Sequence, residues 1–259
     1  MVVITMFERG AIFDAVRSMY TEVATHPERG FHFPHGRTAC EYVGYPAEVL
    51  DAIPPAAVES FAGVGYPFAA EVIRTGDIVL DIGSGSGTDA LIAATLVGRT
   101  GRVIGLDMTA AMRRKLAQNA AAMGVTVDVV DGNAEEIPLP DASVDVVTSN
   151  GVINLVPDKL KAAAEIARVL RPGGRLQIAD IVVESLPSEA CRNQPQLWAE
   201  CIVGATTEPD YLATFARAGF ADVEVLDHRD YFAKSANAET RKVAAGFGAH
   251  AVVFRAWKP

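Results

Sequence analysis

The chain of 259 residues contains only three cysteines, Cys40, Cys191 and Cys201. A small, odd number of cysteines is typical of reducing compartments, where thiols stay free. No stretch approaches the ~20 consecutive apolar residues of a membrane-spanning helix, so we expect no membrane partner. The first residues are apolar but carry neither a basic leader nor a small-residue cleavage site, which argues against a signal peptide. We therefore expect a cytoplasmic protein.

The sequence also lacks an excess of positive charge. Its formal net charge is −9 at pH 7, and the sequence contains no run of basic residues. Nucleic-acid binding depends on lysines and arginines that contact phosphates, so we expect no nucleic-acid partner. Half of the residues (50%) are hydrophobic, which is enough for one large α/β domain with its own core. We find no sequence signal for an oligomeric state.

The most informative stretch is residues 79–88, which read VLDIGSGSGT. The apolar residues at 78–80 predict a buried strand, and residues 89–96 predict a helix. Between them, Gly83, Gly85 and Gly87 let the backbone turn tightly and allow a ligand to lie against it. Strand, glycine turn and helix indicate a nucleotide-type site at the carboxyl end of a parallel strand.

The details of this turn favour S-adenosylmethionine over a dinucleotide. Dinucleotide-binding turns need a third glycine three residues after the second, and here that position is Thr88. The carboxylate of Asp81, at the end of the strand, would repel a pyrophosphate. It suits the cationic amino group of a methionine moiety instead. The charge pattern therefore predicts adenosylmethionine as the cofactor.

Three further strand ends carry matching chemistry. Asp107 closes the second predicted strand and can accept hydrogen bonds from both ribose hydroxyls. Asn133, with backbone groups of residues 131–138, can read the adenine edge. Asn150 follows the fourth predicted strand, where it would face the reacting end of the cofactor. Each end alone could be an ordinary turn, but the four together, in this order, predict an adenosylmethionine site.

Strands and helices alternate from residue 76 onward. This alternation predicts an α/β fold, a doubly wound, mostly parallel sheet with helices on both faces. Strands are predicted at 78–81, 102–107, 126–130, 144–149, 175–181, 223–226 and 250–257, and helices at 89–96, 110–123, 158–170, 207–217 and around 197–203. In the irregular region 1–70, helices are predicted at 13–23, at 45–50 and from about residue 56, and residues 26–37 read as an ordered loop. We expect 1–70 to form a cap over a core of residues 71–259.

Four runs of the sequence resemble class I adenosylmethionine-dependent methyltransferases: residues 79–87, 103–108, 133–135 and 169–175. Within that class, residues 105–109, 143–155 and 200–205 resemble the arsenite methyltransferases. The resemblance implies a Rossmann-like, seven-stranded sheet with an antiparallel last strand, and a cap tyrosine, here Tyr20, over the cofactor. The expected cofactor contacts are Tyr20, Asp81, Gly83, Ser84, Gly85, Gly87, Asp107, Met108, Asn133, Ala134, Glu135 and Asn150.

The arsenic site of that family is only partly present. The family holds trivalent arsenic with three cysteines, whose positions here are Val64, Gly151 and Cys201. One thiol cannot replace three in binding a soft element. We therefore predict a methyltransferase that acts on an O, N, C or S atom of a small molecule, with arsenite as the alternative. Further alternatives are another reaction on the same scaffold, a cofactor-binding subunit without activity, and an NAD oxidoreductase.

The candidate catalytic residues are Asp180, His35 and Cys201. Asp180 ends the fifth predicted strand and can take a proton from the acceptor or cap a turn. His35 can act as a base, and Cys201 can be a remaining ligand, a nucleophile or a buried apolar residue. Zinc binding by His32, His35 and Cys40 is less favoured than structural roles, so no metal is expected. Other candidates for the acceptor pocket are Tyr20, Val64, Tyr66, Asn150 and Asn154.

Overall fold

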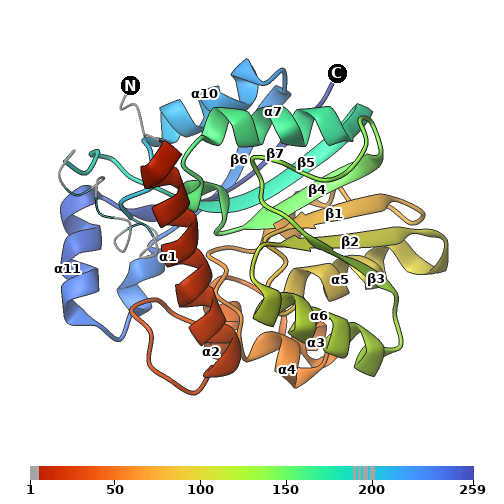
Figure 1. The fold of residues 1–259 in the computed structure, drawn as a ribbon, viewed down its shortest axis with the longest axis horizontal. Helices are drawn as coiled ribbons and strands as arrows, with labels where there is room; N and C mark the ends of the chain where they lie inside the picture. Colours follow the sequence, from red (N-terminus) through yellow and green to blue (C-terminus); the bar gives the residue numbers. More distant parts are fainter. Residues whose placement is uncertain (1–5, 189–190, 192–193, 195–197, 199–201) are drawn as a thin grey trace.

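The computed structural model describes residues 6–259 except 189–190, 192–193, 195–197 and 199–201. In this part of the chain, seven strands form one sheet in the order β3-β2-β1-β4-β5-β7-β6 (Figure 1). Six strands run in the same direction, and β7 runs antiparallel to both of its neighbours, β5 and β6. The predicted doubly wound sheet with its antiparallel last strand is thus confirmed. The strands are β1 (Ile78–Ile82), β2 (Arg102–Asp107), β3 (Val127–Asp131), β4 (Val144–Asn150), β5 (Leu170–Val182), β6 (Ala221–Arg229) and β7 (His250–Trp257).

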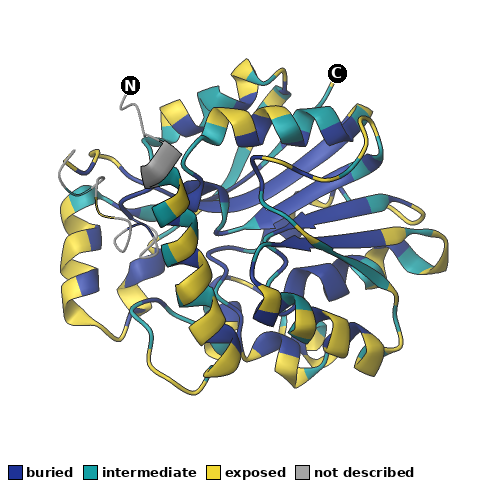
Figure 2. Cartoon of the chain, in the orientation of Figure 1, coloured by how far each residue is buried: buried dark blue, intermediate teal, exposed yellow. Residues whose placement is uncertain are grey.

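Helices cover both faces of the sheet, as the alternating pattern predicts (Figure 1). One face carries α5 (Thr88–Val97) and α6 (Ala110–Met123), and the other carries α7 (Lys159–Val169) and α10 (Glu208–Arg217). Neighbouring strand residues alternate between the two sides, because successive side chains of a strand point to opposite faces. Val79 joins the buried cluster beneath α5 and α6, whereas Leu80 joins the cluster beneath α7 and α10. Figure 2 shows the strands as the most buried part of the molecule.

One long helix, α1 (Met6–Thr25), and several short ones precede the sheet: α2 (Gly36–Tyr42), α3 (Ala47–Asp51), α4 (Pro55–Val58) and the 3-10 turn η1 (Pro67–Ala70). Their buried residues, among them Val16 and Phe61, belong to the same cluster as Val79 of β1. The region before the sheet therefore shares its core with the sheet. A boundary at residue 70 stays a prediction.

Several elements differ from the predicted ones. α2 begins at Gly36, inside residues read as a loop, and β5 begins at Leu170, so that residues 171–174 extend a strand. The chain also forms α11 (Ala238–Phe247), which the apolar pattern does not predict because its sequence is rich in alanine and charge. Capping marks this helix: Asn237 accepts hydrogen bonds at its start, and Gly248 ends it in a left-handed conformation.

The helix predicted around residues 197–203 falls largely outside the described residues. None of the helices that are described has the length and apolarity to cross a bilayer.

Candidate active site

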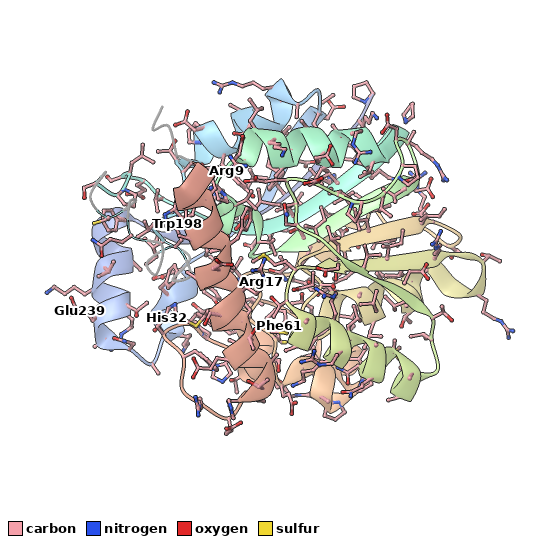
Figure 3. All side chains as sticks on the ribbon, viewed as in Figure 1. Arg9, Arg17, His32, Phe61, Trp198 and Glu239 are labelled. Carbon is pink, nitrogen blue, oxygen red and sulfur yellow. The ribbon has the colours of Figure 1, made fainter. Side chains whose placement is uncertain are left out.

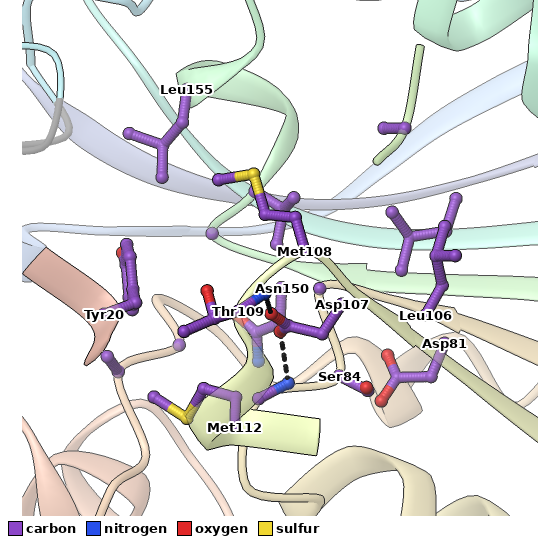
Figure 4. A pocket seen from close by; sticks show the side chains of 18 of the residues that line it. Tyr20, Asp81, Ser84, Leu106, Asp107, Met108, Thr109, Met112, Asn150 and Leu155 are labelled. Carbon is purple, nitrogen blue, oxygen red and sulfur yellow. Dashed lines mark hydrogen bonds between the residues drawn. The ribbon is translucent and has the colours of Figure 1, made fainter. Parts of the chain in front are cut away.

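A cleft lies between α1 and the carboxyl ends of β1, β2 and β4 (Figure 4). It contains about 960 Å³ of space between atoms, counting the part open to solvent. Tyr20 enters from α1, and Asp81, Asp107 and Asn150 enter from the three strand ends. Other expected cofactor residues that line the cleft are Gly83, Ser84, Gly85, Met108, Asn133 and Ala134. The fold thus gathers at one place residues that are far apart in the sequence.

The glycine turn after β1 requires glycine for two reasons. Gly83, Gly85 and Gly87 have φ angles of 69°, 53° and 104°, a region that side chains disfavour. A Cβ atom at Gly83 would also overlap the side chain of Val152. Gly87 does not line the cleft, but it starts α5 and packs against Leu116. The turn therefore brings bare backbone to the cleft.

Asp81 is the most unusual side chain in the cleft. It is only 2% exposed, and its Oδ2 atom has no hydrogen-bond partner among the described residues. Burial raises the pKa of this carboxyl well above its ordinary value, and the negative charges of Asp89 and Asp107 add to the effect. The hydroxyl of Ser84, which lies beside Asp81 in Figure 4, also lacks a hydrogen-bond partner within the described part of the chain. Buried polar groups are normally paired, so this pair of orphaned atoms fits a cationic, hydrogen-bonding ligand group such as the amino group of adenosylmethionine.

Asp107 is held in place by backbone donors. Gly85 N donates to Oδ2 at 2.9 Å and Thr109 N donates to Oδ1 at 2.7 Å. Burial raises the pKa of the Asp107 carboxyl, and these hydrogen bonds partly offset the rise. Each carboxylate oxygen can accept more than one hydrogen bond, so Asp107 still has capacity for ribose hydroxyls.

Asn133 and Ala134 line the cleft next to Asp107, but Glu135 does not. Glu135 is buried, forms an ion pair with Arg9 and accepts a hydrogen bond from Asp158 N at 2.7 Å. Arg9 lies on α1 (Figure 3). The structure thus places Glu135 where it ties α1 to the loop after β3. A direct contact between Glu135 and the cofactor stays a prediction.

Asn150 links the cap to the sheet. Its Oδ1 accepts hydrogen bonds from Val64 N at 2.7 Å and Gly65 N at 3.3 Å. Its Nδ2 lies 3.1 Å from Asp89 Oδ2 and 3.0 Å from the Tyr45 hydroxyl. The amide is fully used by protein groups, so Asn150 positions the wall of the cleft rather than offering spare donors.

The sequence analysis missed Asp89 and Tyr45. Asp89 lines the cleft, is 6% exposed, and accepts a hydrogen bond from the buried Tyr45 hydroxyl. Burial raises the pKa of Asp89 to about 6, although the hydrogen bonds from Tyr45 and Asn150 oppose the rise. The acidic first turn of the helix after the glycines was a usable signal for Asp89. Nothing local marks Tyr45, which meets Asp89 only through the tertiary fold.

Val64 and Gly151, the two positions at which the resemblance to arsenite methyltransferases implies a cysteine, adjoin each other. Gly151 lines the cleft, and a Cβ atom built on it would lie 3.3 Å from Val64 Cγ1. Val64 is fully buried and does not itself line the cleft. Cys201 lies outside the described residues. Cys40 is buried in the cap, where burial raises the pKa of its thiol, and it does not reach the cleft.

The other catalytic candidates lie away from the cleft. Asp180 is fully buried and accepts hydrogen bonds from Tyr211 Oη at 2.5 Å, Ile181 N at 2.8 Å and Asn154 N at 2.9 Å. Burial raises the pKa of Asp180 to about 6. His35 Nε2 lies 3.0 Å from Pro27 O. These contacts favour structural roles, and catalytic roles for both residues stay predictions. His32, Tyr66 and Asn154 are also absent from the lining.

Comparison with known proteins agrees with this geometry. A family model described as a methyltransferase domain matches residues 73–219. An arsenite methyltransferase of Halobacterium salinarum is 38% identical over 186 residues, which cover 71% of this chain and 47% of that protein. A second arsenite methyltransferase, from Aquipseudomonas alcaligenes, is 34% identical over 73% of this chain and 57% of its own length. The chain spans about half the length of these curated relatives.

Solved structures give the same picture. The crystal structure of CrArsM, an arsenic(III) S-adenosylmethionine methyltransferase from Chlamydomonas reinhardtii, superposes with a TM-score of 0.66 at 30% identity, over 87% of this chain and 75% of that one. The family match covers more than half of the chain, and the cleft offers a buried, unpaired carboxylate where the cofactor's amino group would sit. The chain therefore contains a methyltransferase domain of the class I S-adenosylmethionine-dependent family.

Proposed function

We propose that the chain methylates a small organic molecule with a largely apolar body, bound in the cleft between α1 and the strand ends. The part of the lining that is not needed for the cofactor is mostly hydrocarbon. Its apolar residues include Phe13, Val16, Phe61, Leu155 and Val156. Burial of apolar acceptor surface against these side chains would supply affinity, and a few polar groups would fix orientation.

Different residues of the cleft would bind different parts of the cofactor. Asp81 and Ser84 would bind its amino group, Asp107 its ribose, and Asn133 with Ala134 its adenine. When bound, adenosylmethionine supplies an electrophilic methyl group on a sulfonium. The carboxylates of Asp81, Asp89 and Asp107 give this part of the cleft a negative potential that favours a cationic cofactor.

The remaining task of the protein is to align the acceptor and to keep water out. α1 provides one wall of the cleft through Phe13, Val16 and Tyr20. The ion pair between Arg9 and Glu135 fastens this helix to the loop after β3. Closure by α1 would therefore both desolvate the methyl group and limit the size of the acceptor.

The lining also constrains the chemistry of the acceptor. In the described part of the chain it contains no histidine, lysine, arginine or cysteine. An acceptor that holds its proton tightly would need a strong base at this point. The absence of such a base favours acceptors that lose a proton easily, such as thiols, acidic phenols or activated carbon acids.

Arsenite is the alternative acceptor. Trivalent arsenic is soft and needs several thiolates, and the adjoining positions Val64 and Gly151 offer none. The hydrocarbon at these two positions is the observation that carries our preference for an organic acceptor. The sparse cysteines, at least two of them free thiols, support a cytoplasmic location, and the net charge of −9 supports a small-molecule acceptor over nucleic acid.

An acceptor screen tests the proposal. The chain is incubated with adenosylmethionine and single acceptors, and release of adenosylhomocysteine is measured. The panel contains thiols, phenols, amines, carbon acids, and arsenite with a thiol reductant. We expect turnover with an organic acceptor and none above background with arsenite. Arsenite turnover equal to that of the best organic acceptor would overturn the proposal.

A further inference from the structure

Three metal-binding side chains meet at the edge of the sheet, away from the cleft. They are Glu208 at the start of α10, His228 near the end of β6 and His250 at the start of β7. Glu208 Oε2 lies 3.0 Å from His228 Nε2 and 3.4 Å from His250 Nε2. One ligand atom from each residue lies within 4.8 Å of the other two.

The fold explains why these three residues meet. His228 pairs with Val252 across the antiparallel ladder, so His250, two residues before Val252, lies on the same face of the sheet. α10 packs on that face through Tyr211, whose ring lies 5.9 Å from that of Phe254. The first turn of α10 therefore reaches the two histidines. A register shift in β6 between residues 225 and 227 lies just before His228.

The distances match those of a bound ion. In tetrahedral coordination with bonds of about 2.1 Å, neighbouring ligand atoms lie about 3.4 Å apart. Two of the three separations, 3.0 and 3.4 Å, are close to this value, and the third is within 4.8 Å. Both imidazoles also direct the same kind of nitrogen, Nε2, toward the carboxylate. A single ion near Glu208 Oε2 would therefore contact all three side chains after small adjustments.

The hydrogen bonds of His250 add an independent argument. Its Nδ1 lies 2.9 Å from Gly248 O, and a carbonyl oxygen can only accept, so Nδ1 carries a hydrogen. In the neutral ring Nε2 then has a lone pair, yet it faces the Glu208 carboxylate, which is also an acceptor. Either a second ring proton or a metal ion between Nε2 and the carboxylate removes this conflict. Donation of the other ring N–H to a backbone carbonyl is the usual arrangement of metal-binding histidines.

The site is open to solvent on one side. The His228 side chain is 54% exposed, and those of His250 and Glu208 are about a quarter exposed, at 25% and 27%. The two histidines also line a second, open cavity next to α11. An ion can therefore enter without unfolding, and coordination positions remain for water.

We propose that Glu208, His228 and His250 bind one divalent transition-metal ion. Two imidazoles and one carboxylate suit Zn²⁺, and Co²⁺ can serve as a spectroscopic probe. The ion would fasten the start of α10 to the β6–β7 edge. The sequence analysis expected no metal and did not consider these residues, which are separated by up to 42 positions. The proposal stands apart from the methyl-transfer reaction and does not depend on it.

Calorimetric titration of the untagged full chain with Zn²⁺ tests the proposal. We expect one ion per chain, a visible absorption spectrum with Co²⁺, and a melting temperature about 5–10 °C higher at Zn²⁺ a hundredfold above its Kd. His228→Ala and Glu208→Ala should each weaken Zn²⁺ binding at least tenfold. His26→Ala is the matched control, because His26 is similarly exposed (48%) and also adjoins a glutamate.

Two results would overturn the proposal. One is the absence of saturable Zn²⁺ binding at concentrations up to about 1 mM in the folded chain. The other is binding that persists unchanged in His228→Ala and in a His228→Ala, His250→Ala double variant. His228 is largely exposed, so the single variant is expected to fold, and circular dichroism checks this before titration. Should the double variant fail to fold, His228→Ala and Glu208→Ala still decide the question.

Discussion

Replacement of Asp81 by asparagine should have opposite effects on ligand binding and on stability. In the wild-type chain the Asp81 carboxylate is buried, has an unpaired Oδ2, and lies near the negative charges of Asp89 and Asp107. Asparagine keeps the size of the side chain but removes the charge. The Asp81→Asn variant should lose the charge-assisted hydrogen bond to the cofactor's amino group. In the ligand-free protein it should also lose the electrostatic repulsion between residue 81 and the carboxylates of Asp89 and Asp107.

The magnitudes follow from these contacts. A hydrogen bond to a charged group contributes about 1.5–3 kcal/mol, which corresponds to a roughly 10- to 100-fold weaker Kd for adenosylhomocysteine. Relief of the buried, unpaired charge should stabilise the ligand-free chain by about 1 kcal/mol or more. At this chain length that is a rise in melting temperature of about 2–4 °C. Asp128→Asn is the control, since Asp128 lies on β3 and its side chain is 40% exposed.

The same carboxyl sets a pH dependence. Because the folded-state pKa of Asp81 is raised, the ligand-free folded chain binds more protons than the unfolded chain. The contribution of Asp81 to stability is therefore fully present below the ordinary aspartate pKa and is lost as pH rises through the raised one. The buried carboxyls of Asp89 and Asp180, each with a pKa of about 6, act in the same direction. The affinity for the cofactor should instead increase as pH rises, because the cationic amino group binds the ionised Asp81 carboxylate more strongly than the protonated one.

Calorimetry with adenosylhomocysteine and thermal unfolding across pH 5–8 measure both effects. Equal affinity in the Asp81→Asn and wild-type chains would refute the assignment of Asp81 to the amino group. A variant that lost binding and stability together would show that Asp81 has only a structural role.

Three other variants test the roles assigned to residues in and around the cleft. The double variant Val64→Cys, Gly151→Cys should bind arsenite, which would be measured as a loss of thiol reactivity when arsenite is added. It should lower the free energy of unfolding by about 1–3 kcal/mol, because Gly151 has a left-handed backbone (φ 70°). If arsenite does not protect the new thiols, the placement of these two positions is contradicted. Asn150→Ala should lower the free energy of unfolding by about 2–3 kcal/mol in denaturant titration, because it leaves buried partners unpaired; a loss below about 0.5 kcal/mol would refute the linking role. Asp180→Asn should destabilise by about 1–3 kcal/mol and leave KM unchanged, whereas a large fall in kcat with normal stability would restore Asp180 as a catalytic residue.

The fold could be predicted because its signals are local and repeated. The alternation of short apolar strands with helices predicts the sheet, and the GxGxG turn after Asp81 marks the strand where the cofactor site lies. The carboxyl ends of parallel strands meet at one edge of the sheet, so polar residues at these ends lie close together whatever the loops do. Asp81, Asp107 and Asn150 are thus brought to one cleft without further assumptions.

Other features depend on contacts that no local pattern carries. Tyr45 meets Asp89 across 44 positions, and Arg9 meets Glu135 across 126. Such pairs form only when the cap packs on the sheet. Conversely, Asp180 has the position of a catalytic group in the sequence, but Tyr211 and two backbone amides already satisfy it. A structural carboxylate differs from a functional one in that protein donors already fill its hydrogen-bonding capacity. The sequence does not show which donors lie near a carboxylate in the fold.

A crystal structure of the chain with adenosylhomocysteine tests the account most directly. We predict the ligand in the cleft beneath α1, with its amino group within hydrogen-bond distance of Asp81 Oδ2 and its ribose hydroxyls on Asp107. The acceptor end should then face Gly151 and the apolar side chains Phe13, Phe61 and Leu155. A ligand bound elsewhere, or one whose amino group leaves Asp81 Oδ2 unpaired, would contradict the account.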